Sequence, residues 1–239
     1  MNLFLVFIYT LNLTALSWLV YKAYLVLGKN PLKNYYLPAL LFKVASGIAL
    51  GLLYSFYYNG GDTFLFFEKA KDLLALPVDQ YLNEIFLTSI PHEERSVLPM
   101  TKITSLILVL TGKNYWLATL YFSLFSFAGT FYFLIALSTK YPEVRKSAVL
   151  AFLFFPSVVF WSSGILKESI VFGIMMFMLG FLFWYLVTRK INLWYLIMML
   201  VGGWMILLLK YYIAAVFFAN YPDSFCRSDS AKCKVFQFC

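Results

Sequence analysis

The chain has 239 residues, 62% of them hydrophobic and 21% aromatic but only 13% charged, and its mean hydropathy is +0.79. These values lie far outside the range of soluble domains, so the sequence predicts an integral membrane protein. A net charge of +8 would suggest nucleic-acid binding in a soluble protein. In a membrane protein such an excess is first explained by the orientation of the chain, and we assign no nucleic-acid partner.

Long stretches without charged residues predict the membrane helices. Each is near the ~20 residues that a spanning helix needs, and they are residues 3–21, 44–61, 114–139, 147–166, 169–188 and 191–209. Because they are continuously apolar rather than alternating, we predict an all-α, polytopic bundle of about six transmembrane helices instead of a barrel. The first stretch lacks the basic start and small-residue exit of a signal peptide, so we expect it to remain a helix.

The charged residues between these stretches predict the orientation. Three loops are basic and should be cytoplasmic; they hold Lys29 and Lys33, then Lys140, Arg145 and Lys146, then Arg189 and Lys190. Residues 62–94 hold seven of the eleven acids, so this segment belongs on the external side. The amino terminus is then external as well, and the first helix runs inward.

The second helix, about residues 37–58, runs outward to a long external segment, residues 59–100. Lys43 lies about one turn inside the membrane edge, where it could snorkel to the interface. Gly47 and Gly51 form a small-xxx-small spacing that would let a neighbouring helix approach closely. Apolar residues at helical spacing predict two interfacial helices in the external segment, over residues 64–74 and 79–87, and the apolar residues 103–110 are too short to span.

The remaining predicted helices cover residues 115–138, 147–162, 169–187 and 191–212, with Pro156 kinking the second of these. They complete a transmembrane domain over residues 1–218. Residues 219–239 form a polar tail that contains Cys226, Cys233 and Cys239. An external tail permits a disulfide, but three cysteines leave one unpaired, and their pairing stays open. Their spacing does not match a metal site.

Two short segments carry the residues best suited to chemistry, and the predicted orientation places both outside. The first is Gly61, Asp62 and Thr63; the second is the hairpin with Ser163, Gly164, Lys167 and Glu168. Ionisable groups near the hydrocarbon edge are costly without partners and often functional. Lysine could hold a phosphate, a carboxylate could act as a base or bind a divalent cation through oxygen ligands, and glycines let a backbone approach a ligand.

Each of these features also has a purely structural interpretation. Asp62 could simply be the N-cap of the following helix, and Lys167 and Glu168 could mark a helix boundary. His92, Glu93 and Glu94 are typical of a solvated turn rather than a metal site. The aromatic residues around Tyr58 and Tyr115 are typical of an interfacial belt.

The order of these segments resembles polytopic glycosyltransferases of the GT-C superfamily. The resemblance rests on the external loop that opens with Asp62, on "LTGKNYWLATLYFSLFSFAGTFYFL" and on "AVLAFLFFPSVVFWSSGILKES", and it covers about residues 37–212. It implies a sugar donor linked to polyprenyl phosphate and a catalytic centre with Asp62 and Glu168. Many relatives have Asp where this chain has Lys167 and Glu168, the first helix is additional, and the chain stops before the family's last helices, as a truncated member would.

The resulting hypothesis is sugar transfer to a glycan or lipid acceptor on the external face of a bacterial inner or plasma membrane. Asp62 would be tuned by burial and accept the acceptor's proton or act through a divalent cation, while Glu168 would assist and Lys167 would steady the phosphate. Gly61, Thr63, Ser163 and Gly164 would contact the substrate, and the helix around Phe64 and Phe67 would guide the lipid tail. The alternatives are a polysaccharide polymerase-like protein or a non-enzymatic assembly or transport component, although transport is disfavoured because no charge lies in the middle of a predicted helix.

Overall fold

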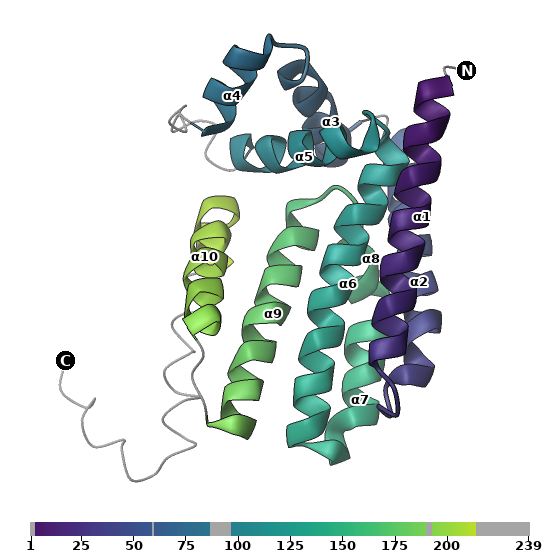
Figure 1. The fold of residues 1–239 in the computed structure, drawn as a ribbon, viewed down its shortest axis with the longest axis vertical. Helices are drawn as coiled ribbons and strands as arrows, with labels where there is room; N and C mark the ends of the chain where they lie inside the picture. The colour runs from purple at the N-terminus through teal and green to yellow at the C-terminus, as the bar shows by residue number, and fades with distance from the viewer. Residues whose placement is uncertain (1–2, 59, 87–96, 190–192, 214–239) are drawn as a thin grey trace, which may run out of the picture.

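The structure, a computed structural model, describes residues 3–58, 60–86, 97–189 and 193–213. Within these ranges the chain is helical and contains no strand, which confirms the all-α prediction. Figure 1 shows a bundle of roughly parallel helices with three further helices lying across one of its ends. His92, Glu93, Glu94 and the three cysteines of the carboxyl-terminal tail fall outside the described residues.

Four helices are long and apolar enough to cross a membrane. They are α1 (Leu3–Val26), α2 (Lys33–Phe56), α6 (Tyr115–Lys140) and α9 (Lys167–Thr188). A fifth apolar helix of the bundle, α10 (Leu193–Leu209), is shorter. The chain is therefore a membrane protein, but only four of the six predicted membrane helices form as continuous helices of spanning length in its described part.

The segment predicted to be a kinked fourth membrane helix is instead broken into short pieces. A 3₁₀ turn (Pro142–Val144) leads into α7 (Arg145–Val149), a π-helix (Leu150–Phe154) and α8 (Pro156–Trp161). Phe155 between the last two pieces has an extended backbone, with φ −71° and ψ 114°. The predicted kink was wrong because a proline disfavours helical geometry at the residue before it while suiting the first position of a new helix.

The centre of the bundle is formed by α2, α6 and α9, which approach closely at glycines. A Cβ atom on Gly47 would lie 2.6 Å from the Ser123 Oγ atom of α6, and one on Gly51 would lie 3.0 Å from the Tyr115 ring. This confirms the close helix approach predicted for the Gly47/Gly51 pair. A Cβ atom on Gly129 of α6 would meet the Gly173 carbonyl oxygen of α9 at 2.4 Å, so the two backbones touch there.

Three helices, α3 (Asp62–Leu73), α4 (Val78–Phe86) and α5 (Leu98–Thr111), lie across one end of the bundle and are called the roof (Figure 1). α3 buries Phe66, Phe67 and Ala70 in the same cluster as Met100 and Leu108 of α5. The two predicted interfacial helices therefore form, and the apolar segment near residue 103 belongs to a helix that lies across the bundle rather than along it.

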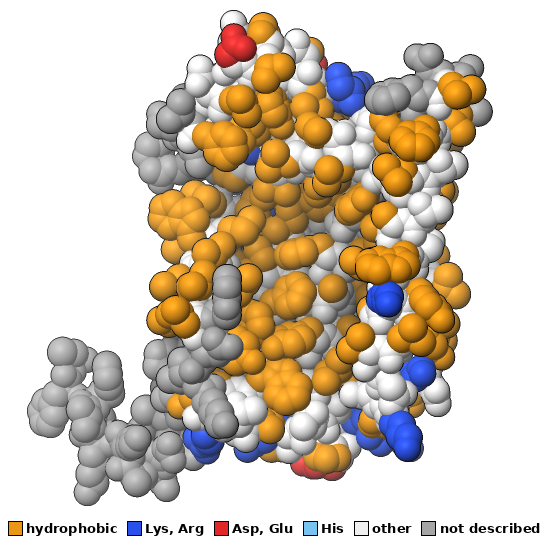
Figure 2. Space-filling view, in the orientation of Figure 1, with side chains coloured by type: hydrophobic (Ala, Val, Ile, Leu, Met, Phe, Trp, Pro, Cys, Tyr) orange, Lys and Arg blue, Asp and Glu red, His pale blue; other side chains and the backbone are white. Residues whose placement is uncertain are grey.

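The opposite end of the bundle is its basic end. Figure 1 places the α1–α2 loop, the α6–α7 loop and the end of α9 together there, and Figure 2 shows Lys and Arg side chains gathered at the same end. Lys140 at the end of α6 donates a hydrogen bond to the Leu186 carbonyl of α9, 3.3 Å away. The described residues of the three segments that were predicted to be cytoplasmic thus share one end, and the roof lies at the other, while Lys190 lies outside the described residues.

The start of α6 is fixed by a side-chain cap. Asn114 has an extended backbone, and its Oδ1 atom accepts a hydrogen bond of 3.0 Å from the Leu117 amide. We expect Asn114→Ala to lower the free energy of unfolding by about 1 kcal/mol, because an amide of the first turn loses its acceptor. Equilibrium unfolding in mixed detergent micelles measures this loss, and Asn114→Asp, which keeps an oxygen acceptor, serves as the control; equal losses in the two variants would contradict the cap.

Candidate functional site

Asp62 begins the roof at the point where α2 ends. Gly61 precedes it with φ 104°, a conformation that favours glycine, and a Cβ atom there would lie 2.7 Å from the Tyr54 ring. Gly61, not Asp62, is the N-cap of α3, so the interpretation of Asp62 as the cap was wrong by one residue. Asp62 occupies the first helical turn, where a negative charge is favourable, and it is exposed rather than buried as predicted.

Lys167 and Glu168 open α9 directly beside α3. The Lys167 ammonium lies 5.1 Å from the centre of the Phe66 ring of α3. Asp62 and Glu168 both act electrostatically on this ammonium and on the Tyr54 hydroxyl of α2. Asp62 is therefore a neighbour of Lys167 and Glu168 at the roof end of the bundle, although more than 100 positions separate it from them in the chain.

The structure adds a second lysine to this group. Lys210, the residue after α10, forms an ion pair and a hydrogen bond with the Glu168 carboxylate. The Lys210 side chain is 15% exposed and that of Glu168 is 41% exposed, so the pair is partly withdrawn from solvent. Sequence reasoning missed Lys210. The signal was that Lys210 directly follows the last apolar stretch, residues 191–209, which was predicted to end on the external side with the other three residues. We call Asp62, Lys167, Glu168 and Lys210 the polar cluster.

Three residues predicted to contact substrate are buried in the protein. The Ser163 hydroxyl donates to the Val159 carbonyl at 2.6 Å, and the Gly164 amide donates to the Ser123 hydroxyl at 3.1 Å. Thr63 is also fully buried, and its hydroxyl is hydrogen-bonded to that of Tyr115. Their assignment as substrate contacts stays a prediction that this burial does not favour, while Gly61 is exposed.

The aromatic residues at the start of α3 face inward as well. Phe67 is buried, and Phe64 stacks on the Tyr115 ring with centroids 4.8 Å apart. Tyr115 itself is 9% exposed. The prediction that Tyr115 belongs to an interfacial belt was therefore wrong, because these rings join α3 to α6. Guidance of a lipid tail by the helix around Phe64 and Phe67 stays a prediction.

Lys43 contradicts the prediction that it snorkels to the interface. It is the eleventh of the 24 residues of α2 and is only 4% exposed. Its ammonium donates to the Ser162 carbonyl at 2.7 Å and to the Ser162 hydroxyl at 2.5 Å, and it lies 3.5 Å from the Val159 carbonyl. Lys43 thus satisfies the carbonyls at the end of α8, where the negative end of a helix favours a cation. The argument that no charge lies in the middle of a helix was also wrong.

Within the described ranges, no group of three or more His, Cys, Asp and Glu side chains comes together to hold a metal ion. Asp62 and Glu168 offer two carboxylates, so a divalent cation at the polar cluster would need further oxygen ligands from a substrate or water. No protein-family model, curated protein or solved structure matches this chain.

Proposed function

We propose that the chain is a membrane glycosyltransferase that takes its sugar from a polyprenyl-phosphate-linked donor. The observation that carries the proposal is the polar cluster, in which Asp62, Lys167, Glu168 and Lys210 from three separate parts of the chain share one end of an apolar bundle. Charged groups at the edge of a membrane domain are costly and are often retained for function. A phosphate and a hydroxyl acceptor are the substrates that lysines and an exposed carboxylate would suit.

In the proposed step a carboxylate accepts the proton of the acceptor, and a lysine stabilises the leaving phosphate. The acceptor's hydroxyl oxygen attacks the anomeric carbon of the donor sugar, and the bond from that carbon to the phosphate oxygen breaks. Asp62, exposed at the start of α3, takes the hydroxyl proton, and Lys167 stabilises the charge of the departing polyprenyl phosphate. Glu168 holds Lys210 beside this site through their ion pair. A divalent cation would add to the charge on the phosphate side.

An apolar face below the roof supports a lipid-linked donor. Figure 2 shows this face hollowed between α10 and α1, with hydrophobic side chains over α6 and α9. Ring contacts connect α6, α9 and α10 in series. Phe125 of α6 contacts Phe177 of α9, Phe177 contacts Phe181 of the same helix, and Phe181 contacts Tyr195 of α10. A polyprenyl tail could lie along this surface while its phosphate reaches the polar cluster. As part of the same proposal, the reaction takes place at the external face of a bacterial plasma membrane.

The test is sugar transfer by the purified chain in liposomes. A panel of radiolabelled polyprenyl-phosphate sugars is supplied together with extracted glycan and lipid acceptors, and labelled product is counted. We expect Asp62→Asn to lose about 100-fold or more of the transfer rate, because a positioned base typically contributes 10²–10⁴-fold. Glu68→Gln is the matched control, since Glu68 is an exposed acid of the same helix that pairs with Lys71 2.8 Å away.

Unchanged transfer by folded Asp62→Asn protein would remove Asp62 from the reaction. Transfer that falls equally in Glu68→Gln would point to the charge of α3 as a whole rather than to Asp62. Absence of any product with the wild-type chain, across the whole panel, would reject the glycosyltransferase proposal and favour a non-enzymatic role.

One observation favours a non-enzymatic role in transport. Lys43 is buried in the middle of α2, and it faces the end of a helix that is broken at Phe155 and Pro156. Buried charges and discontinuous helices are typical of transporter sites near the membrane midplane. A cavity of about 10 Å³ lies beside Lys43, which is room for about one water molecule and not for a substrate. We therefore rank transport below the enzymatic proposal.

A further inference from the structure

The first helix is attached to the bundle at two places and is uncovered between them. α1 is the least covered of the four long helices. Near the roof, Asn12 donates to the Leu110 carbonyl at 3.0 Å and accepts from the Tyr121 hydroxyl at 2.6 Å. Near the basic end, Tyr24 packs against Tyr36 of α2 with ring centroids 6.2 Å apart. α1 is therefore attached to the bundle on both sides of the uncovered stretch.

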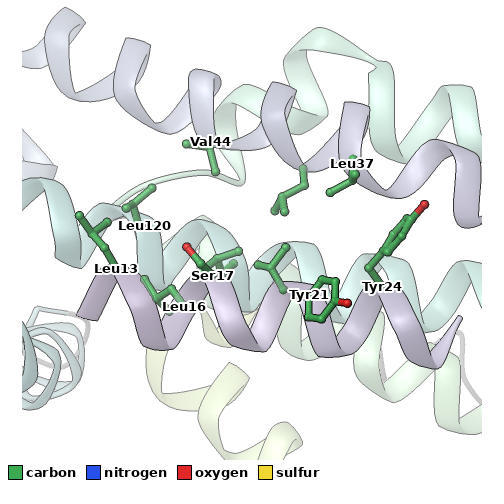
Figure 3. Close-up of a pocket in the computed structure, with 11 residues that line it drawn as sticks. Leu13, Leu16, Ser17, Tyr21, Tyr24, Leu37, Val44 and Leu120 are labelled. Atoms are coloured by element: carbon green, nitrogen blue, oxygen red, sulfur yellow. The ribbon is translucent and has the colours of Figure 1, made fainter. Parts of the chain in front are cut away.

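That space is a groove of about 520 Å³ between α1, α2 and α6. Figure 3 shows side chains of α1 and α2 pointing into it from opposite sides. Its lining is aliphatic except for Ser17, Tyr21 and Tyr24 of α1. The volume lies in the range of ~300–1,000 Å³ that is typical of small-molecule sites. We call it the α1 groove.

The position of the α1 groove decides what can fill it. All of its walls belong to helices that are long and apolar enough to span the membrane, so the surrounding medium is hydrocarbon. Water would find few polar partners along an aliphatic lining, and an empty groove of this size would forfeit dispersion contacts on all its walls. A flexible hydrocarbon chain is the occupant that both supplies these contacts and can enter from the side.

The charge at one end of the groove identifies the headgroup. Tyr24 lines the groove at its basic end, and the Lys33 ammonium lies 4.5 Å from the centre of the Tyr24 ring. Lys29 lies in the short loop that precedes Lys33, the first residue of α2. Basic residues beside a membrane helix attract anionic lipids.

We infer that the α1 groove binds one acyl chain of an anionic phospholipid whose phosphate lies beside Lys33. This site is separate from the polar cluster, which lies at the roof end, and it does not depend on the proposed reaction. It attaches a lipid to the one long helix that the rest of the bundle leaves almost uncovered.

The test is native mass spectrometry of the purified, delipidated chain with dioleoyl phosphatidylglycerol or dioleoyl phosphatidylcholine. The wild-type chain should retain one phosphatidylglycerol with about a fivefold preference over phosphatidylcholine, as expected for one lysine near the headgroup. Val20→Trp and Ser17→Phe fill the groove and should lower occupancy by both lipids severalfold. Leu19→Trp is the matched control, because Leu19 is 57% exposed on the same helix and does not line the groove.

The headgroup is tested separately. Lys33→Gln should abolish the preference for phosphatidylglycerol and leave binding of phosphatidylcholine unchanged, whereas Lys146→Gln, in α7 at the same basic end, should alter neither. Equal occupancy in the groove-filling variants and in Leu19→Trp would overturn the proposal, and so would equal binding of the two lipids by the wild-type chain. A dimer that dissociates on Val20→Trp would instead assign the groove to a second copy of the chain.

Discussion

The Lys43→Met variant is expected to lose roughly 2–3 kcal/mol of its free energy of unfolding. Methionine preserves the length and apolar stem of the side chain but removes the ammonium that donates to the Ser162 carbonyl and hydroxyl. Removing a charge from a buried site is favourable in itself. The opposing effect is larger, because hydrogen bonds to a charged donor are worth about 1.5–3 kcal/mol and their loss leaves buried acceptors at the end of α8 without this donor.

Equilibrium unfolding in mixed micelles with increasing sodium dodecyl sulfate measures this loss. Lys22→Met is the matched control, since Lys22 is an exposed lysine of α1 that contacts the Trp18 ring 5.5 Å away. Its free energy of unfolding should stay within about 0.5 kcal/mol of the wild-type value. Equal stability of Lys43→Met and the wild-type chain would mean that the buried charge contributes no net stabilisation.

Gly129→Ala should destabilise the chain by at least ~2 kcal/mol. The new methyl group would lie 2.4 Å from the Gly173 carbonyl oxygen and 3.1 Å from the Phe177 ring. Alanine is the better helix former by about 1 kcal/mol, but overpacking against a fixed backbone costs about 1–3 kcal/mol or more, and the two central helices would have to separate along their contact. Overpacking should therefore outweigh helix propensity.

Gly202→Ala, measured in the same unfolding assay, gains the same helix propensity but places its methyl group against side chains instead of a backbone. Its methyl group would meet side-chain atoms of Ile174 and Met178 at 2.9 and 3.2 Å, and the methionine can adjust. We expect a loss less than half that of Gly129→Ala. A larger loss in Gly202→Ala would show that α10 is packed more rigidly than α6 and α9.

The sequence was most informative where structure depends on local pattern. Long apolar stretches predicted the four continuous spanning helices, and amphipathic spacing predicted the roof helices α3 and α4. The charge of the loops predicted that three of them share one end, which Figure 1 bears out. The proline at residue 156 correctly marked a departure from regular helix, but whether a proline kinks a helix or starts a new one also depends on tertiary contacts. Here Lys43 of another helix holds the carboxyl end of α8, the short helix that begins at Pro156.

The candidate site was predicted only in part, because part of it depends on how the helices pack against one another. That Asp62, Lys167 and Glu168 lie at the same end of the bundle followed from counting membrane crossings, which needs no knowledge of packing. Burial of Ser163 and Thr63 and the pairing of Glu168 with Lys210 depend on how helices rotate and tilt against one another. In helices that are apolar on every side, the sequence pattern does not predict which face points into the bundle.

The break before α8 also constrains how the chain is made. Residues 162–166 are non-helical and buried, and they begin level with the middle of α2, where Lys43 meets Ser162. Backbone groups at that depth tolerate no contact with lipid. This hairpin therefore cannot be released from the insertion machinery into the bilayer as an independent element. Its integration must wait until α2 and α6 are already assembled to receive it, so biogenesis of this half of the protein is coupled to tertiary contacts formed by the earlier half.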